Sequence, residues 1–278
     1  MAIAVILKTP RILKIIKAIL LTTLLLAIGI IFELSLIGLD KFTNFIKKGT
    51  EEHIIGIAYI LMWTSFIVVA YFFWKPRPNL KSELNIKQLD FTLIPYLLII
   101  VIGLGFATQP IVDFNRIIDF YLNSETKPHY QFSGFSAYFI YFRISSILIA
   151  PVFEELFFRK FLFSKLLEKN KIWIAILISS LCFSAIHYPT PNNLIPTFIY
   201  GVIACIIYMK TKNIVYLIVI HFLNNLCPML YSIFANPFFD WLYGLNYDFM
   251  YWALFVFGIL TTILGVKKIT TANIEVQK

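Results

Sequence analysis

Eight apolar stretches dominate this chain of 278 residues, and short polar segments separate them. A helix of about 20 apolar residues crosses the hydrocarbon core of a bilayer, and in lipid the backbone must satisfy its own hydrogen bonds. Only 14% of the residues are charged, against about 25% in soluble domains. We therefore predict an all-α fold, a polytopic membrane helix bundle of about eight transmembrane helices, with no separate soluble domain.

The ends of the apolar runs set the boundaries of these helices. The predicted spans cover residues 18–39, 54–74, 91–112, 135 to the glutamate pair at 154 and 155, 172–188, 194–209, 214–234 and 248–266. Residues 158–168 follow the fourth span and combine aromatic with basic side chains, which is typical of a short amphipathic helix at the membrane interface.

The basic residues indicate how the bundle is oriented. Of the 24 lysines and arginines, 18 fall on one side of the alternating spans, five fall on the other, and Arg143 lies inside a span. Cytoplasmic loops carry the excess of Lys and Arg, so we predict a multi-pass protein of the cell membrane with both termini cytoplasmic. The net charge of +9 is then a topology signal, and the expected partner is the lipid bilayer rather than nucleic acid.

Two adjacent carboxylates, Glu154 and Glu155, interrupt the apolar segment at residues 150–159. Arg159 is four residues after Glu155 and shares its helical face, so these two are expected to form a buried ion pair that supports the site structurally. Glu154 is rotated by about 100° and is left to exchange protons as a general base or acid. Alternatively, both glutamates reach water at the cytoplasmic interface.

Two histidines occupy later apolar segments, His187 in the fifth predicted span and His221 in the seventh. A single histidine in an apolar helix is more often a hydrogen-bonded core residue than a ligand. Asn225 is four residues after His221, so the imidazole and the amide point to one side of their helix. With Glu154 these groups could activate water against a carbonyl and stabilise the oxyanion, or they could bind a metal that keeps an open position.

Glu154 and His187 are predicted at different depths. At 1.5 Å per residue along ideal helices, Glu154 falls near the cytoplasmic end of the fourth span and His187 near the outer end of the fifth. They can meet if the helices tilt, if the fourth span starts well outside the hydrocarbon core, or if residues 165–171 dip below the membrane surface.

Three motifs on separate spans together resemble a known family. They are Glu154-Glu155-x-x-x-Arg159, Phe183-x-x-x-His187 and His221-x-x-x-Asn225. This set resembles the CPBP family, the CAAX-protease and bacteriocin-processing (Abi) intramembrane endopeptidases. The resemblance covers about residues 135–235, and Lys160 stands where the family often has glycine.

The resemblance implies an intramembrane endopeptidase acting on a membrane-associated peptide or protein, prenylated or leader-bearing. Glu154 and His187 would activate the water, while His221 and Asn225 would hold the oxyanion. It also divides the chain into N-terminal spans and loops (1–134), a CPBP-like catalytic core (135–235), and a last span with a basic tail (236–278).

Both metal-dependent and glutamate-based chemistry have been described for this family. We favour the glutamic type without a cofactor, because asparagine is a poor zinc ligand whereas its amide is a good oxyanion donor. The alternative is zinc bound by Glu154, His187 and His221.

Two other functional classes fit the same residues. The chain could be a non-catalytic membrane immunity or binding factor of this fold. It could also be a proton-coupled transporter whose buried ionisable residues relay protons, although we find no inverted repeat of the kind many transporters carry.

Overall fold

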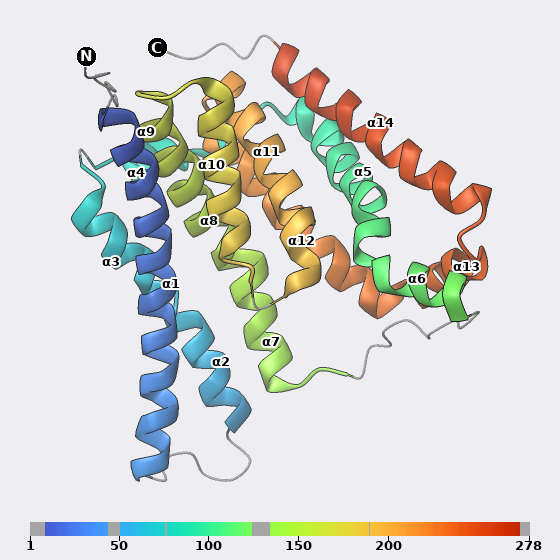
Figure 1. Ribbon diagram of the computed structural model, residues 1–278, viewed down its shortest axis with the longest axis horizontal. Helices are drawn as coiled ribbons and strands as arrows, with labels where there is room; N and C mark the ends of the chain where they lie inside the picture. Colours follow the sequence, from blue (N-terminus) through green and yellow to red (C-terminus); the bar gives the residue numbers. More distant parts are fainter. Residues whose placement is uncertain (1–8, 44–50, 76, 124–133, 189, 273–278) are drawn as a thin grey trace, which may run out of the picture.

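The computed structural model describes residues 9–43, 51–75, 77–123, 134–188 and 190–272, and these residues form helices and connecting loops without any strand (Figure 1). The helices are α1 (Thr9–Thr43), α2 (Glu51–Leu61), α3 (Thr64–Phe73), α4 (Leu80–Glu83), α5 (Ile94–Val112), α6 (Phe114–Asn123), α7 (Ala137–Ile144), α8 (Ala150–Glu155), α9 (Ser164–Leu167), α10 (Ile172–Ala185), α11 (Leu194–Thr211), α12 (Ile214–Phe234), α13 (Asn236–Gly244) and α14 (Phe249–Thr271). The predicted all-α class is confirmed.

Within the described part of the chain, six helical segments are long and apolar enough to cross a membrane. They are Ile15–Phe32, Phe91–Val112, Ala137–Leu167, Pro191–Thr211, Ile214–Phe234 and Phe249–Thr271. The other two predicted spans contain shorter apolar helices, α3 and α10. The second predicted span is interrupted between α2 and α3, and the fifth ends at Ala185. A multi-pass membrane protein is therefore supported, with six long spans and two short apolar helices.

The predicted interfacial helix at 158–168 is not a separate surface element. Two π-helical turns, Ser145–Ile149 and Leu156–Phe163, join α7, α8 and α9 into one helical segment. Seven of the eight residues in the second turn are buried, because aromatic rings from other helices cover them. Phe157, for example, packs edge-on against Phe66 of α3 at 5.6 Å between ring centroids.

This correction changes the expected depth of the glutamate pair. The segment Ala137–Leu167 has 31 residues, or about 46 Å at 1.5 Å per residue, which exceeds the hydrocarbon thickness of about 30 Å. Glu154 lies near the middle of this segment, not near its end. The depth difference expected between Glu154 and His187 came from ending the fourth span too early.

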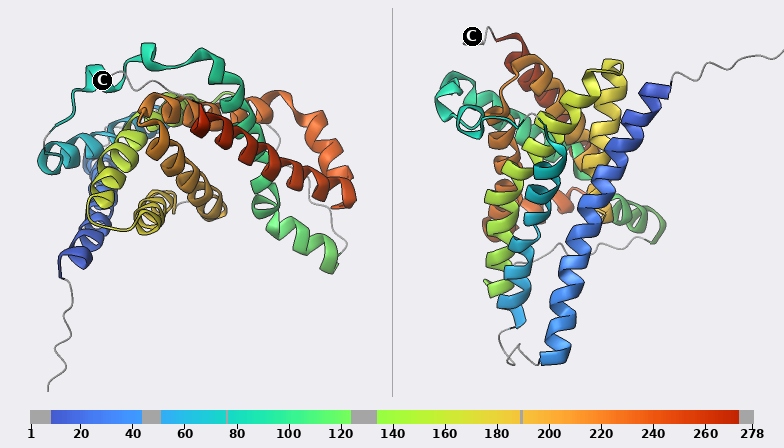
Figure 2. Two further views of the ribbon diagram at one scale, coloured as in Figure 1. Left: turned by 90° about the horizontal axis from the view of Figure 1, so that it is seen from above. Right: turned by 90° about the vertical axis from the view of Figure 1, so that its left-hand side faces the viewer.

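The helices are arranged as an open arc. Seen from above, α1 lies at one end of the arc and α13 and α14 at the other (Figure 2). Helices α5 and α14 lie side by side (Figure 1), and their contact depends on small residues. A Cβ atom added at Gly258 would lie 2.7 Å from the carbonyl oxygen of Gly103, so glycine permits the close backbone approach common between membrane helices.

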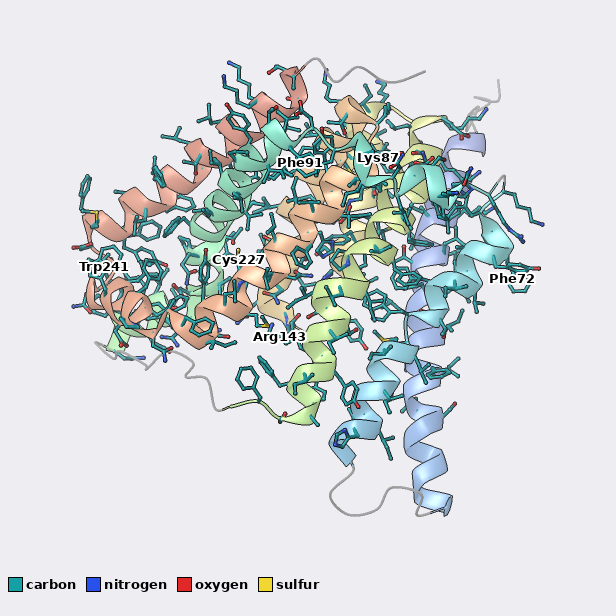
Figure 3. All side chains as sticks on the ribbon, turned by 180° about the vertical axis from the view of Figure 1, so that it is seen from behind. Phe72, Lys87, Phe91, Arg143, Cys227 and Trp241 are labelled. Atoms are coloured by element: carbon teal, nitrogen blue, oxygen red, sulfur yellow. The ribbon has the colours of Figure 1, made fainter. Side chains whose placement is uncertain are left out.

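Apolar side chains remain exposed on the two flanks of the arc. Phe72 of α3 and Trp241 of α13 lie at opposite edges of the molecule (Figure 3), and their side chains are 63% and 48% exposed. Large exposed rings would be unfavourable in water, whereas lipid tails solvate them. The polar residues of interest lie between these flanks, where Arg143 and Cys227 are labelled in Figure 3.

Candidate active site

A cavity of about 1570 Å³ lies among the helices and contains the predicted site residues. Its lining includes Glu154 of α8, His187 after α10, and His221 and Asn225 of α12. Arg143 of α7 also lines it, which places this arginine beside the cavity. The structure thus brings together four residues that three separate segments contribute.

Glu155 has more ion-pair and hydrogen-bond partners than Glu154. Its side chain is fully buried, and its Oε2 lies 3.2 Å from the Nε of Arg159. Its Oε1 lies 2.8 Å from the Nδ1 of His221 and accepts a hydrogen bond of 3.0 Å from the hydroxyl of Tyr200. These three partners hold the carboxyl group of Glu155 in a fixed orientation.

The Arg159 guanidinium is buried by aromatic rings as well as by Glu155. Its nitrogens do not reach hydrogen-bond geometry with any described residue, so the 3.2 Å contact is an ion pair without an aligned N–H bond. The guanidinium carbon instead lies 4.0 Å from the ring centroid of Phe183 and 5.4 Å from that of Tyr200. Cation–π attraction of this kind is strongest when the cation is desolvated.

Glu154 has a different environment. It is only 5% exposed, and its Oε2 has no hydrogen-bond partner among the described residues. The nearest basic group is the Nε2 of His221 at 3.8 Å, beyond hydrogen-bond length. A buried carboxylate oxygen without a partner is costly, so this oxygen is suited to receive a proton or a hydrogen bond from a molecule in the cavity.

His187 is oriented by the backbone of its own helix. Its Nδ1 lies 3.0 Å from the carbonyl oxygen of Phe183. A carbonyl oxygen can only accept, so Nδ1 carries the hydrogen and the lone pair of the neutral ring is on Nε2. The Phe183 ring also contacts both imidazoles, at 5.0 Å from His187 and 5.9 Å from His221 between centroids. Both histidines are therefore positioned through one phenylalanine.

Asn225 fills a gap in the backbone hydrogen bonding of the first π-helical turn. In that turn the N–H of Ala150 bonds to the carbonyl of Ser145, five residues earlier. The next bond of the same register would run from residue 151 to Ser146, but Pro151 has no N–H. The side-chain Nδ2 of Asn225 donates to the Ser146 carbonyl at 2.7 Å. One of the two N–H groups of the Asn225 amide is thus engaged by the backbone of the glutamate helix.

No group of three or more His, Cys, Asp or Glu side chains in the described part of the chain is arranged to hold a metal ion.

Two site residues were not predicted from the sequence. Tyr200 of α11 binds Glu155, and Trp63 donates from its Nε1 to the hydroxyl of Ser145 at 2.6 Å. In a chain with 15 tyrosines and five tryptophans, neither residue is conspicuous. The one available signal was that Trp63 and Tyr200 both lie inside predicted spans, where a polar aromatic atom needs a partner.

Comparison with known proteins agrees with this assembly. Residues 136–227 match the family model described as type II CAAX prenyl endopeptidase Rce1-like. This match confirms the predicted resemblance to the CAAX-protease family and includes all of the predicted site residues.

A shorter part of the chain is similar to a bacterial protein. The Bacillus subtilis protein named "Putative membrane peptidase YdiL" is 35% identical over 82 residues, which are 30% of this chain and 33% of the relative. The matched region therefore spans about a third of the relative's length. No solved structure matches the chain.

Proposed function

We propose that this protein is an intramembrane endopeptidase that hydrolyses a peptide bond of a membrane-associated substrate with a water activated by Glu154. The observation that carries the proposal is the contrast between the two glutamates. Glu155 is bound by Arg159, His221 and Tyr200, whereas Glu154 faces the cavity with an oxygen that no described residue binds.

The contrast assigns different roles to two chemically identical side chains. Glu155 is neutralised by Arg159 and occupied by two further donors, so it cannot take a proton from substrate without breaking a buried network. The Oε2 of Glu154 has no hydrogen-bond partner among the described residues. It is placed to act as the general base, a role that needs a carboxylate within hydrogen-bond reach of the attacking water.

In the first step Glu154 takes one proton from water while the water oxygen attacks the scissile carbonyl carbon. The lone pair on Nε2 of His187 accepts the other water hydrogen and orients the nucleophile. A C–O bond forms, and the electron pair of the carbonyl moves to its oxygen. The resulting oxyanion is the species that the site must stabilise.

His221 and Asn225 are the donors for this oxyanion. His221 takes part in its imidazolium form, in which Nδ1–H donates to Glu155 at 2.8 Å and Nε2–H is left to donate to the substrate oxygen. The Nε2–H of His221 and the second N–H of Asn225 donate hydrogen bonds to the negative charge that develops on this oxygen in the transition state. When the C–N bond breaks, Glu154 returns its proton to the leaving amine.

The substrate that fits this proposal is a peptide held at the membrane, such as one with a prenylated C-terminus. The matching family model is described as a prenyl endopeptidase, and a cavity of about 1570 Å³ has room for more than a peptide bond. We further propose that the protein lies in the cell membrane with cytoplasmic termini, in line with the excess of basic residues on one side of the spans.

The test is cleavage of an internally quenched peptide by the purified protein in liposomes. Two probes of one sequence are compared, with and without a farnesyl group on the C-terminal cysteine motif. Glu154→Gln is expected to lower kcat by about 10²–10⁴-fold, the usual contribution of a general base. Glu168→Gln, an exposed position later in the chain, is the matched control and should retain activity.

Two outcomes would contradict the proposal. Full activity in Glu154→Gln would remove the general base, and inactivity of the wild-type protein on both probes would favour a binding factor or a transporter. A chelator added to the active protein addresses the metal-free mechanism. We expect no loss of rate, and a loss that zinc restores would replace that mechanism with a metal-dependent one.

A further inference from the structure

A break in the second apolar segment brings Trp63 against the glutamate helix. The sequence predicts one continuous span over 54–74, but α2 ends at Leu61 and α3 begins at Thr64. Between them the N–H of Trp63 bonds to Ile60 and the N–H of Phe66 bonds to Trp63, each three residues back. This tight turn leaves the Trp63 side chain buried, with 7% of its surface exposed.

Trp63 contacts the glutamate helix at two points. Its Nε1 donates to the Ser145 hydroxyl at 2.6 Å, and Ser145 is the first residue of the π-helical turn Ser145–Ile149. Its ring stacks on Phe153, at 6.1 Å between centroids and 25° between planes. Phe153 immediately precedes Glu154. One side chain therefore touches both the start of the π-helical turn and the neighbour of the proposed base.

The π-helical turn determines which way Glu154 faces. Each residue of a regular α-helix adds about 100° of rotation, and a π-bulge inserts one residue relative to the α-helical register. If the turn returned to α-helical geometry, everything after it would rotate by about one residue. Glu154 would then leave the cavity wall, and Glu155 would lose its alignment with His221 and Tyr200, which lie on other helices.

The turn needs support from outside its own helix. Pro151 removes one backbone donor, and Asn225 replaces it at the Ser146 carbonyl. Trp63 binds the adjacent residue, Ser145. Trp63 belongs to a segment that precedes the family match at 136–227. Two side chains from two other segments thus bind consecutive residues of one turn.

We propose that Trp63 is a positioning residue for Glu154, acting through the Ser145 hydroxyl and the Phe153 ring. The inference rests on the proposed function, because it concerns the rate of that reaction. It extends the active site to the N-terminal part of the chain. Trp63 also lines the cavity, but the role proposed for it acts through Glu154, so its loss is expected to lower kcat far more than it changes KM.

The test removes the hydrogen bond from either end. Trp63→Phe keeps an aromatic ring for Phe153 but lacks the indole N–H, and Ser145→Ala deletes a single oxygen. A displacement of about 1 Å in a catalytic group can cost about 100-fold in rate. We expect each variant to lower kcat on the cleaved quenched peptide by about 10- to 100-fold, with KM within about threefold of wild type.

Coupling and rescue distinguish positioning from general damage. If both variants act through one bond, the double variant Trp63→Phe with Ser145→Ala should be no slower than the slower single variant. Ser145→Thr keeps the hydroxyl and should retain most of the rate. Trp74→Phe is the matched control. Trp74 also stacks on a ring of this helical segment, that of Phe161 at 5.2 Å, but in the second π-helical turn, which follows Glu154. We therefore expect the kcat of this variant to be unchanged.

The outcomes separate this inference from the proposed function. If wild-type protein cleaves neither probe, the proposed function fails and the inference with it. If wild-type protein is active but Trp63→Phe and Ser145→Ala keep kcat within about twofold, only the positioning role fails. If Trp63→Phe does not fold, Ser145→Ala with its Ser145→Thr rescue decides alone, since neither change alters the packed ring.

Discussion

The Nδ1 of His221 lies 2.8 Å from the Oε1 of Glu155. The other ring nitrogen of His221 lies 3.8 Å from Glu154. One imidazole therefore links the two adjacent carboxylates, bonded to the structural one and directed toward the free one. This arrangement makes the two glutamates distinguishable by experiment.

Replacing Glu155 should damage folding, whereas replacing Glu154 should damage only turnover. Glu155→Gln leaves Arg159 buried without a counter-ion, and breaking a buried pair in this way typically costs about 3–5 kcal/mol. Glu154→Gln replaces a buried carboxyl group whose Oε2 has no bonded partner, so stability should stay the same or rise. Thermal unfolding of both variants in the same detergent measures the difference.

Equal thermal stability of the two variants would contradict this division of roles. A lower unfolding temperature for Glu154→Gln than for Glu155→Gln would reverse it. The exposed position Glu168 provides the matched Glu→Gln control, for which no change in unfolding temperature is expected.

Tyr200→Phe tests the third donor to Glu155. The substitution keeps the ring that packs against Phe183 and His221 and deletes only the hydroxyl bonded at 3.0 Å. Hydrogen bonds to charged groups contribute about 1.5–3 kcal/mol, and we expect a loss of stability in that range. Tyr71→Phe, at an exposed ring of α3, should be neutral in the same unfolding measurement.

The sequence revealed those site residues that are improbable in a membrane. Glu154, Glu155 and Arg159 stand out because charge inside apolar segments is rare and usually functional. The i, i+4 spacing of Glu155 and Arg159 predicted their ion pair, which the structure contains. The three motifs in order predicted the family resemblance that the family model confirms.

The features that sequence did not reveal depend on tertiary packing. Tyr200 and Trp63 are ordinary aromatic residues in an aromatic-rich chain, and their roles appear only when Glu155 and Ser145 lie opposite them. The π-helical turns likewise depend on partners from other helices. From the sequence, the basic residues within 158–168 favour an interfacial helix, whereas packing against other helices buries seven of the eight residues of Leu156–Phe163.

A second buried polar cluster should make stability sensitive to alkaline pH. Asp113 accepts hydrogen bonds from the hydroxyls of Tyr251 and Tyr243 at 2.9 and 3.1 Å. Burial raises the pKa of Tyr247 to about 12, and the charge of Asp113 adds to the effect. Burial and the same carboxylate raise the pKa of Tyr243 further above its ordinary value.

The sign of the effect follows from these raised pKa values. The unfolded chain loses its tyrosine protons near pH 10, before the folded protein does, so the stabilisation is complete below about pH 10 and falls as pH rises toward 12. Unfolding temperatures between pH 8 and pH 12, with tyrosinate absorbance recorded alongside, measure it. Asp113→Asn should flatten this dependence, and an unchanged slope would show that the Asp113 cluster is not responsible.

Combining a substitution of Pro151 with a substitution of Asn225 distinguishes a structural role of the Asn225 amide from a catalytic role. Asn225→Ala should leave the Ser146 carbonyl without its donor and lower both stability and kcat. In Pro151→Ala the backbone N–H returns and can bond to the same carbonyl.

If Asn225 mainly replaces that N–H, Asn225→Ala should cost less stability and less rate in the Pro151→Ala background than in wild type. A double-mutant cycle measures this coupling. If Asn225 serves the oxyanion through its second N–H as well, stability will be rescued while a loss in kcat persists. Additive effects on both quantities would mean that the hydrogen bond to Ser146 does not compensate for the proline.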